Sequence, residues 1–418
     1  MYVGIEQKIH SLPDVSEKRL NFIKNKNKNK KWNDESMLKA NEELISELIE
    51  KRRILHAYPE TAFEEYETTA RKKKWLETEG LSVLPYDLET GIVAEVKGDK
   101  PGPTIALRAD IDALPIEEEA EVPFKSTVKG KMHACGHDFH TASIFGAARL
   151  LNENKDKING TVRLIFQPAE EIAEGAEWLT EKGVLEGVSA IFGMHNKPDL
   201  PVGTIGIKSG TLMASVDRFK FTFKGIGGHA GIPHEAIDPI IIASQFVLSV
   251  QSIISRKIDL FHNAVISITH IRGGRTWNVI PGSVMVEGTV RTFQPEARDK
   301  IKEEMRKQAR LLSESQGGEV DIDWDERMPT VYNDSRFEKS VKQTTEELGY
   351  SVVEAQPVAG GEDFAYYQQT IPGFFVWMGS NSPYQWHDPK FTLDEGAIKV
   401  ASEFFANLAL TVLQDSSI

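Results

Sequence analysis

The feature that most limits how this chain can fold is a change in the spacing of its apolar residues about halfway along. In the first half, compact apolar runs such as 91–98, 104–110, 161–168 and 188–195 alternate with segments of helical periodicity. Continuous apolar strands between helices are typical of an α/β sheet that is covered on both faces. From 212 to 326 apolar and polar residues alternate instead, as in strands that bury one face. We therefore expect two structural units, one of which interrupts the other.

The interrupting segment has the order strand, helix, strand, strand, helix, strand, which makes a complete ferredoxin-like unit. After it the α/β pattern returns with an apolar strand at 373–380 and a C-terminal helix. The predicted domains are an N-terminal extension (1–35), a mixed-sheet α/β domain covered by helices (36–211 and 327–418) and an inserted βαββαβ domain (212–326). Helices are expected at 38–60, 66–80, 141–151, 175–183, 238–255 and 295–315, and strands of the insert at 216–225, 264–274, 283–293 and 319–326.

Length and charge narrow the class of protein. The chain has 418 residues, of which 40% are hydrophobic, as expected for two soluble globular domains. Its net charge of −13 argues against nucleic acid or an anionic membrane as a partner. Cys135 is the sole cysteine and apolar runs such as 239–250 are too short to span a bilayer, so a cytoplasmic protein is expected. The lysine-rich stretch 25–32 is expected to be a mobile extension or a loose helix end.

Histidines cluster around the single cysteine. His133, Cys135, His137 and His140 fall within eight residues of one another. A thiolate and an imidazole two residues apart, with Gly136 between them to let the backbone turn, can both point at one metal cluster. The same residues also fit an ordinary loop with a buried, inert cysteine.

Two adjacent carboxylates follow the apolar run 161–168. Glu170 and Glu171 repel each other, so such a pair is costly at the end of a buried strand unless cations or protons offset the charge. Neighbouring side chains project in different directions, so one could ligate a metal while the other handles the proton of a metal-bound water. A solvated helix start is the alternative, because acidic groups favour that position.

Further candidate ligands lie after other strands of the same predicted sheet. His195 ends the run 188–195, and His387 lies shortly after 373–380. The crevice of an α/β sheet lies beyond the carboxyl ends of its strands, so these groups should converge there. Nitrogen, sulfur and oxygen ligands in one place are typical of a two-metal hydrolytic site. The candidate ligands are Cys135, His137, Glu171, His195 and His387.

Two aspartates end another strand of this sheet. Either Asp110 or Asp112 could accept a hydrogen bond from a ligating histidine and so orient it. We favour Asp112, although a plain turn aspartate fits the position as well.

These motifs resemble, in order, those of the aminoacylase/carboxypeptidase-G class of dinuclear metallopeptidases. Within it they are most similar to the amidohydrolase branch, which contains plant auxin-conjugate hydrolases, bacterial N-acyl-amino acid amidohydrolases and aminobenzoyl-glutamate hydrolase. The resemblance covers roughly residues 48–410. It rests on RRILHAYPETAFEEYET, LRADIDALPIEE, MHACGHDFHTA, FQPAEE, GMHN, KGIGGHAGIPHEAIDPI, NVIPGSVMVEGTVRTF and GGEDFAYY.

The resemblance assigns the five candidate ligands to two metal ions and Glu170 to the role of general base. Cys135 stands where many relatives have an aspartate that bridges the two metals. Asp110 stands where other branches have a metal-binding histidine, and His137 would fill that role. The implied cofactors are two divalent ions, manganese or zinc and in some members cobalt; a thiolate ligand favours zinc.

The resemblance also implies roles for the inserted domain, as a lid and as the contact of a homodimer. His229 matches a histidine that stabilises the tetrahedral oxyanion, often from the partner subunit, although a polar turn beside two glycines is the plainer interpretation. Asn278 and Arg291 match positions suited to the substrate carboxylate, and Arg291 could equally pair with a neighbouring glutamate. Gly360 and Gly361 match a loop that lets the backbone approach a ligand.

The predicted activity is hydrolysis of the amide bond of an N-acyl amino acid by a metal-activated water, with Glu170 as general base. The acyl group is expected to be acetyl or aryl-acyl. A dipeptidase or carboxypeptidase with the same site is the alternative within this class. A non-catalytic protein that binds acyl-amino acids is the alternative outside it.

Overall fold

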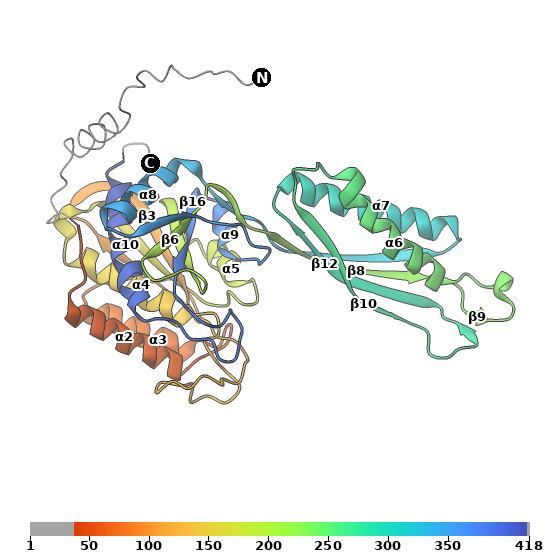
Figure 1. Ribbon diagram of the computed structural model, residues 1–418, viewed down its shortest axis with the longest axis horizontal. Coiled ribbons are helices and arrows are strands. Elements are labelled where there is room, and N and C mark those ends of the chain that lie inside the picture. The colour runs from red at the N-terminus through yellow and green to blue at the C-terminus, as the bar shows by residue number, and fades with distance from the viewer. Residues whose placement is uncertain (1–36, 416–418) are drawn as a thin grey trace, which may run out of the picture. The chain divides into compact units, whose positions relative to one another are not determined.

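The computed structural model describes residues 37–415, so the N-terminal extension expected over 1–35 lies outside the described residues. Its largest sheet has eight strands in the order β1-β2-β4-β3-β5-β16-β6-β15 (Figure 1). Neighbours β4, β3, β5 and β16 run parallel, whereas β1, β2 and β6 each pair antiparallel with a neighbour, so the predicted mixed α/β sheet is confirmed. The strands are β1 (Ser82–Val83), β2 (Ile92–Lys97), β3 (Lys100–Asp110), β4 (Asn159–Gln167), β5 (Val188–Lys197), β6 (Thr204–Ile207), β15 (Ser351–Glu354) and β16 (Gly373–Gly379).

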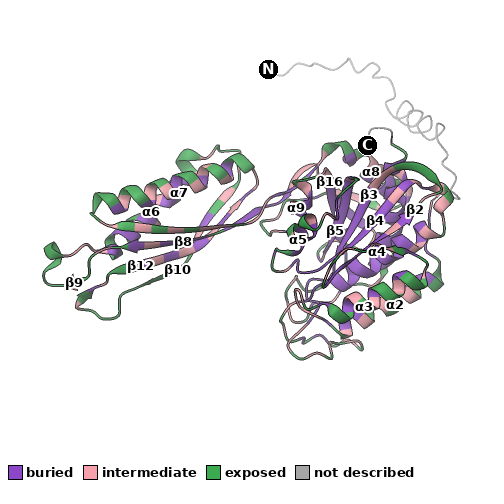
Figure 2. Cartoon of the chain, turned by 180° about the vertical axis from the view of Figure 1, so that it is seen from behind, coloured by how far each residue is buried: buried purple, intermediate pink, exposed green. Residues whose placement is uncertain are grey.

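Helices pack on this sheet, and one of them is buried almost completely. α4 (His137–Asn152) contacts β3, α2 and α10, and Figure 2 shows it buried along nearly its whole length. It begins at His137 rather than at 141, because Gly136 takes a left-handed φ of +84° before the first turn. The polar first turn carries no apolar period, so the pattern begins later than the helix. The other helices of this part are α2 (Glu42–Ala57), α3 (Tyr66–Thr78), α5 (Gly175–Glu181), α8 (Glu338–Glu347), α9 (Phe364–Gln368) and α10 (Gly396–Leu413).

The central parallel strands bring distant segments to one edge of the sheet. Strand β3 ends at Asp110, β4 at Gln167, β5 at Lys197 and β16 at Gly379, and these four strands are neighbours in the sheet. Parallel strands have their carboxyl ends on the same side. The segments that follow these strands therefore meet, although the chain places them more than 250 residues apart.

The inserted segment forms a sheet of its own, with four antiparallel strands in the order β10-β12-β8-β13. Three phenylalanines on one face of β8 belong to the core of this part, and two of them, Phe221 and Phe223, pack against Phe246 of α6. The predicted limits of 212 and 326 remain a prediction. The elements are β8 (Ser215–Lys224), β9 (Gly228–His229), α6 (Pro239–Lys257), β10 (Ala264–Gly273), β11 (Val279–Ile280), β12 (Ser283–Thr292), α7 (Pro295–Ser315) and β13 (Glu319–Met328), while β7 (Gly210–Met213) pairs with β14 (Val331–Asn333).

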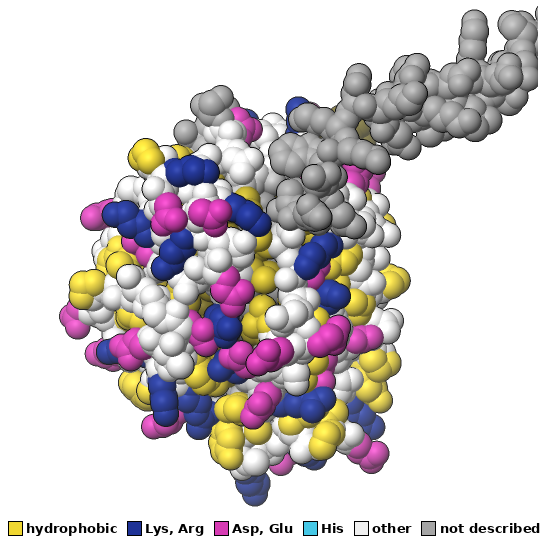
Figure 3. Space-filling view, turned by 90° about the vertical axis from the view of Figure 1, so that its left-hand side faces the viewer, with side chains coloured by type: hydrophobic (Ala, Val, Ile, Leu, Met, Phe, Trp, Pro, Cys, Tyr) yellow, Lys and Arg dark blue, Asp and Glu magenta, His cyan; other side chains and the backbone are white. Residues whose placement is uncertain are grey.

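Two described helices have the length and composition to cross a membrane, α6 and α10. The apolar run of α6 was expected to be too short, but the helix continues to Lys257. Inside the protein, 83% of the apolar window of α10 is buried, as in a core helix, and 33% of that of α6. On the face shown in Figure 3, acidic and basic side chains are interspersed rather than gathered by sign.

Candidate metal centre

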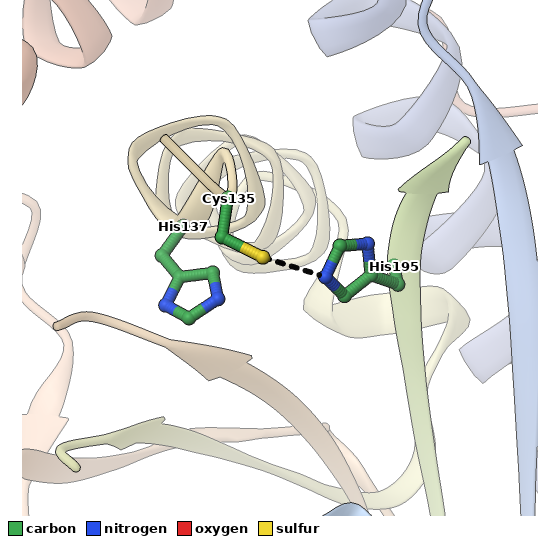
Figure 4. A group of neighbouring side chains, drawn as sticks. All are labelled: Cys135, His137 and His195. Carbon is green, nitrogen blue, oxygen red and sulfur yellow. Dashed lines mark hydrogen bonds between the residues drawn. The ribbon is translucent and has the colours of Figure 1, made fainter. Parts of the chain in front are cut away.

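Three of the predicted ligands meet where α4 begins and β5 ends. Cys135 Sγ lies 3.2 Å from His195 Nε2, and one ligand atom from each of Cys135, His137 and His195 falls within 4.8 Å of the other two (Figure 4). The positive φ of Gly136 turns the chain between the thiol and the first imidazole. A side chain at Gly136 would lie 2.6 Å from Asn196 Nδ2, so this close turn requires glycine.

The remaining two predicted ligands join the same thiol. Cys135, Glu171 and His387 also have ligand atoms within 4.8 Å of one another, and His387 Nε2 lies 3.5 Å from Glu171 Oε2. His387 adopts a φ of +65° and its backbone N–H donates to Ala134 O, which fixes the loop after β16 against the cysteine loop. The structure thus brings all five predicted ligands together, with Cys135 common to two triads.

Hydrogen bonds orient both buried imidazoles. His195 Nδ1 lies 2.8 Å from the carbonyl oxygen of Asn196. Because a carbonyl can only accept, Nδ1 carries the proton and donates it. The lone pair of Nε2 therefore faces Cys135. His137 Nδ1 lies 3.1 Å from Asp112 Oδ1, which leaves Nε2 directed to the cluster. Orienting partners of this kind are usual behind metal-ligating histidines. Asp110, the other aspartate considered, contacts His140 Nδ1 at 2.6 Å.

Two polar atoms at the centre of the cluster are buried and have no hydrogen-bond partner among the described residues. They are His137 Nε2 and Glu171 Oε1, which face each other at 3.8 Å. A buried polar atom without a partner is rare and costly. Both atoms offer lone pairs, so these residues fit divalent cations coordinated by nitrogen, sulfur and oxygen.

Glu170 lies beside the ligands but faces a different set of neighbours. Its Oε1 accepts from the backbone N–H of Asp363 at 3.4 Å, and its Oε2 lies 3.9 Å from His137 Nε2. Ligand atoms of Glu170, Glu362 and Asp363 fall within 4.8 Å of one another. The guanidinium of Arg108 is fully buried below them and bonds to Glu362 and Asp363, both at 2.8 Å.

The electrostatics show a surplus of buried negative charge. Burial, then the charges of Glu362 and Glu171, raises the pKa of Glu170 well above its usual value. Burial also raises the pKa of Glu171 to about 7, although His137 opposes the shift. The pKa of the Cys135 thiol is raised well above its usual value by burial and by both glutamates. Such groups ionise together only when cations compensate their charge.

The predicted substrate residues fall into two groups at opposite ends of the inserted sheet. His229 and Asn278 lie together, since His229 pairs with Val279 and the N–H of Ala230 donates to Asn278 O. They follow the end of the sheet at Lys224, which is the far end from Ser215, roughly 30 Å along β8. His229 is exposed, and its Nδ1 accepts from Gly231 N.

Arg291 belongs to the other end of that sheet, where it pairs with Val216. It donates to Thr289 Oγ1 at 2.8 Å and, among the described residues, forms no salt bridge with a glutamate. A side chain at Gly361 would lie 2.4 Å from Val216, whereas one at Gly360 would meet only Met213 at 3.7 Å. The close approach expected of this loop is therefore seen at Gly361.

Several buried partners of the site were not predicted. His140 bonds to Asp110 and accepts from the N–H of Asn196 at 2.9 Å. Its signal was visible, because it lies one helical turn after His137 and shares its face. The roles of Arg108 and Glu362 had no local signal, since the two residues are 254 positions apart in the chain.

Comparison with known proteins identifies the family to which a chain with this site belongs. The model of peptidase family M20/M25/M40 matches residues 106–411. The chain is 55% identical to an N-acetylcysteine deacetylase of Bacillus subtilis, over 90% of this chain and 99% of that protein. It is 39% identical to thermostable carboxypeptidase 1 of Saccharolobus solfataricus, over 87% of this chain and 94% of that protein.

A solved structure agrees with the sequence matches. The Bacillus subtilis protein YXEP, described as a dinuclear metal binding peptidase from family M20, is 52% identical, with a TM-score of 0.82 over 90% of this chain and 99% of that one. A family match across most of the chain and a relative that is 55% identical over nearly its whole length lead to one conclusion: this chain belongs to peptidase family M20/M25/M40.

Proposed function

We propose that the protein is a metal-dependent amidohydrolase that splits N-acyl amino acids into the acid and the free amino acid. The observation that carries this proposal is the pair of buried, unpartnered atoms, His137 Nε2 and Glu171 Oε1, at the centre of five converging ligands. Two divalent cations bound there would lower the pKa of a shared water and polarise the amide carbonyl.

Glu170 is the general base of the proposed reaction. Its Oε1 is held by the Asp363 N–H, so Oε2 is the oxygen directed toward the ligand cluster. Burial and the neighbouring carboxylates raise the pKa of Glu170, so it holds an accepted proton more strongly than a free carboxylate does. Glu170 therefore takes the proton of the attacking water, keeps it while the tetrahedral intermediate exists, and delivers it to the leaving amine nitrogen.

The inserted domain is proposed to be a ferredoxin-like lid that also joins two subunits. His229 and Asn278 lie at the end of the inserted sheet remote from Arg291, so one subunit presents its substrate residues in two separate places. A partner subunit's His229 would complete the site and stabilise the oxyanion. Exposed apolar side chains on α6 and on the edge strand β10 support such a contact.

The relatives favour an acetyl or other small acyl group, since the 55% identical protein is named for deacetylation of N-acetylcysteine. Carboxypeptidase activity is the second candidate, because a relative at 39% identity carries that name. The two activities differ in the acyl group attached to the nitrogen of the scissile amide bond. Assay of N-acetyl amino acids against free-amine dipeptides, each with added manganese, zinc or cobalt, separates them.

Replacement of Glu170 tests the mechanism. Glu170→Gln should keep both metals, as measured by elemental analysis, and lose at least about 1,000-fold in kcat, because the amide cannot take a proton. Glu174→Gln, an exposed neighbour in the same loop, is the matched control and should stay within about threefold of the wild type. Normal turnover of N-acetyl amino acids by Glu170→Gln would show that another group is the base.

A further inference from the structure

The turn that carries Glu170 and Glu171 is held in an unusual backbone conformation. Ala169, directly before Glu170, has a φ of +56°, and Ala173, after Glu171, has a φ of +60°. Residues with a Cβ rarely adopt this left-handed region, and they keep it only when the surroundings impose it. Ala169 is fully buried, so solvent cannot supply a partner for its N–H.

The partner of that N–H comes from a distant part of the chain. Ala169 N donates to Glu65 Oε1 at 2.9 Å, across 104 residues. Two positions further on, Glu171 N donates to Asp112 Oδ2 at 3.0 Å. Two carboxylates therefore hold alternate N–H groups of the same turn, and Glu170 lies between them.

Apart from Ala169, the carboxylate of Glu65 interacts with its neighbour Thr90 and with its own backbone N–H. Glu65 precedes α3, but its side chain makes no capping hydrogen bond to that helix. It is completely buried, and so is Lys72 on the same helix, whose charge interacts favourably with that of Glu65. Lys72 Nζ donates to Thr141 Oγ1 at 3.1 Å, and Thr141 Oγ1 donates to Asp110 O at 3.0 Å, which links α3 to the end of β3.

We propose that Glu65 is a positioning residue for the general base: by accepting from Ala169 N–H it imposes the left-handed turn that points Glu170 at the reacting water. This rests on the proposed function, because it assumes Glu170 to be the base. The motif YPETAFEEYET, which contains Glu65, otherwise has no assigned part in the chemistry. The hydrogen-bond acceptor is what matters in this role, rather than the negative charge.

Two nearly isosteric substitutions show whether the hydrogen-bond acceptor or the negative charge of Glu65 is required. Glu65→Met removes the acceptor and keeps the volume, so kcat for an N-acetyl amino acid should fall about 100-fold through misplacement of Glu170. KM and metal content should stay within about threefold, since the ligands are not displaced. Glu65→Gln retains an oxygen acceptor and should lose less than about fivefold in kcat.

A second substitution distinguishes positioning from a general loss of structure. Glycine adopts positive φ without strain, so Ala169→Gly should recover at least about tenfold of the kcat lost in Glu65→Met. Ala173→Gly is the matched control, because it relieves the same kind of strain at a residue whose N–H bonds to Glu170 O instead. The double variant Glu65→Met with Ala173→Gly should show no recovery.

The outcomes that overturn the proposal are distinct. Equal loss in Glu65→Met and Glu65→Gln, recovery by both glycines, or a kcat within about threefold of the wild type in Glu65→Met would each exclude it. If Glu65→Met does not fold, Glu65→Asp is used in its place. Its carboxylate is one methylene short of Ala169 N–H, so kcat should fall about tenfold. Ala169→Gly should again reverse this loss. A wild type that hydrolyses no N-acyl amino acid would instead refute the proposed function and, with it, the role given to Glu65.

Discussion

At the scale of single residues, the site is defined by how buried polar atoms are partnered. In both His195 and His137, Nδ1 contacts an oxygen that orients the ring. The second ring nitrogen, Nε2, is therefore directed to the ligand cluster. Glu65 does the same for the backbone, by partnering the N–H of Ala169. A buried carboxyl in that position has consequences for stability as well as for catalysis.

The pH dependence of stability should report the burial of Glu65. Burial first, and then the charge of Asp112, raises the pKa of Glu65 from 4.5 to about 7. Between these values the folded protein keeps a proton that the unfolded chain has lost, so rising pH favours unfolding. Glu65→Gln removes this penalty. The free energy of unfolding of Glu65→Gln, minus that of the wild type, should rise between pH 4.5 and about pH 7, by at most about 3 kcal/mol. Above this range the difference should stay level.

Urea unfolding of the metal-free protein between pH 4 and 8 measures this difference. Glu64→Gln is the control, because Glu64 is exposed and its pKa is lowered, by hydrogen bonds from Lys131 and Thr61, rather than raised. It should show no rise in the same window. A relative stability of Glu65→Gln that falls from pH 4.5 to 7 would contradict the assignment of the raised pKa.

At the scale of elements, α4 is the part on which the ligands depend. It carries His137 in its first turn and lies between the sheet and the helices α2 and α10. At Gly146 the backbone of α4 lies close to both neighbouring helices. A Cβ there would lie 2.3 Å from Ser402 Oγ of α10 and 2.6 Å from Leu48 Cδ1 of α2. Close packing on both sides fixes the helix whose first turn holds the candidate ligand His137.

Enlarging this contact should destabilise the protein. Gly146→Val forces α2 and α10 apart and is expected to lower the free energy of unfolding by about 1–3 kcal/mol, as overpacking does in other cores. Denaturant titration measures the change. The control is Gly282→Val in the inserted segment, where no neighbouring atom lies within 4 Å of the added Cβ, so stability should be nearly unchanged. Equal effects of the two substitutions would show that α4 is not tightly packed.

At the scale of the whole molecule, the proposed lid presents apolar surface along one edge of its sheet. Leu248 of α6 is 76% exposed, and Ile241, two turns earlier, is 49% exposed. The neighbouring edge strand β10 exposes Val265 and Ile271. Exposed apolar side chains beside an edge strand are typical of a surface that another chain covers.

Disruption of this surface should separate subunits and reduce activity together. Leu248→Glu places a charge in the proposed contact, so we expect sedimentation velocity to give a dimer for the wild type and a monomer for this variant. Its kcat should fall at least about tenfold without the partner's His229. Leu311→Glu, the same change at an exposed position of α7, is the control and should leave the assembly intact. A monomeric wild type with full activity would refute the shared site.

The sequence by itself determined the mixed α/β class, the order of the main elements in the insert and the candidate ligands that the structure brings together. These follow from local periodicity and from one rule, that parallel strands end on the same side of a sheet. It missed short strands such as β6 and β15, whose four residues are too few to show a period. It also placed the start of α4 too late, because the first turn is polar.

Only the tertiary structure decided which buried groups serve one another. The strand order sets β16, from the end of the chain, beside β5, and thereby brings His387 to Cys135. The pairings of Glu65 with Ala169 and of Arg108 with Glu362 join residues 104 and 254 positions apart. No local pattern encodes such partners, because a buried polar group is matched by whatever donor or acceptor the packing of distant elements places within reach.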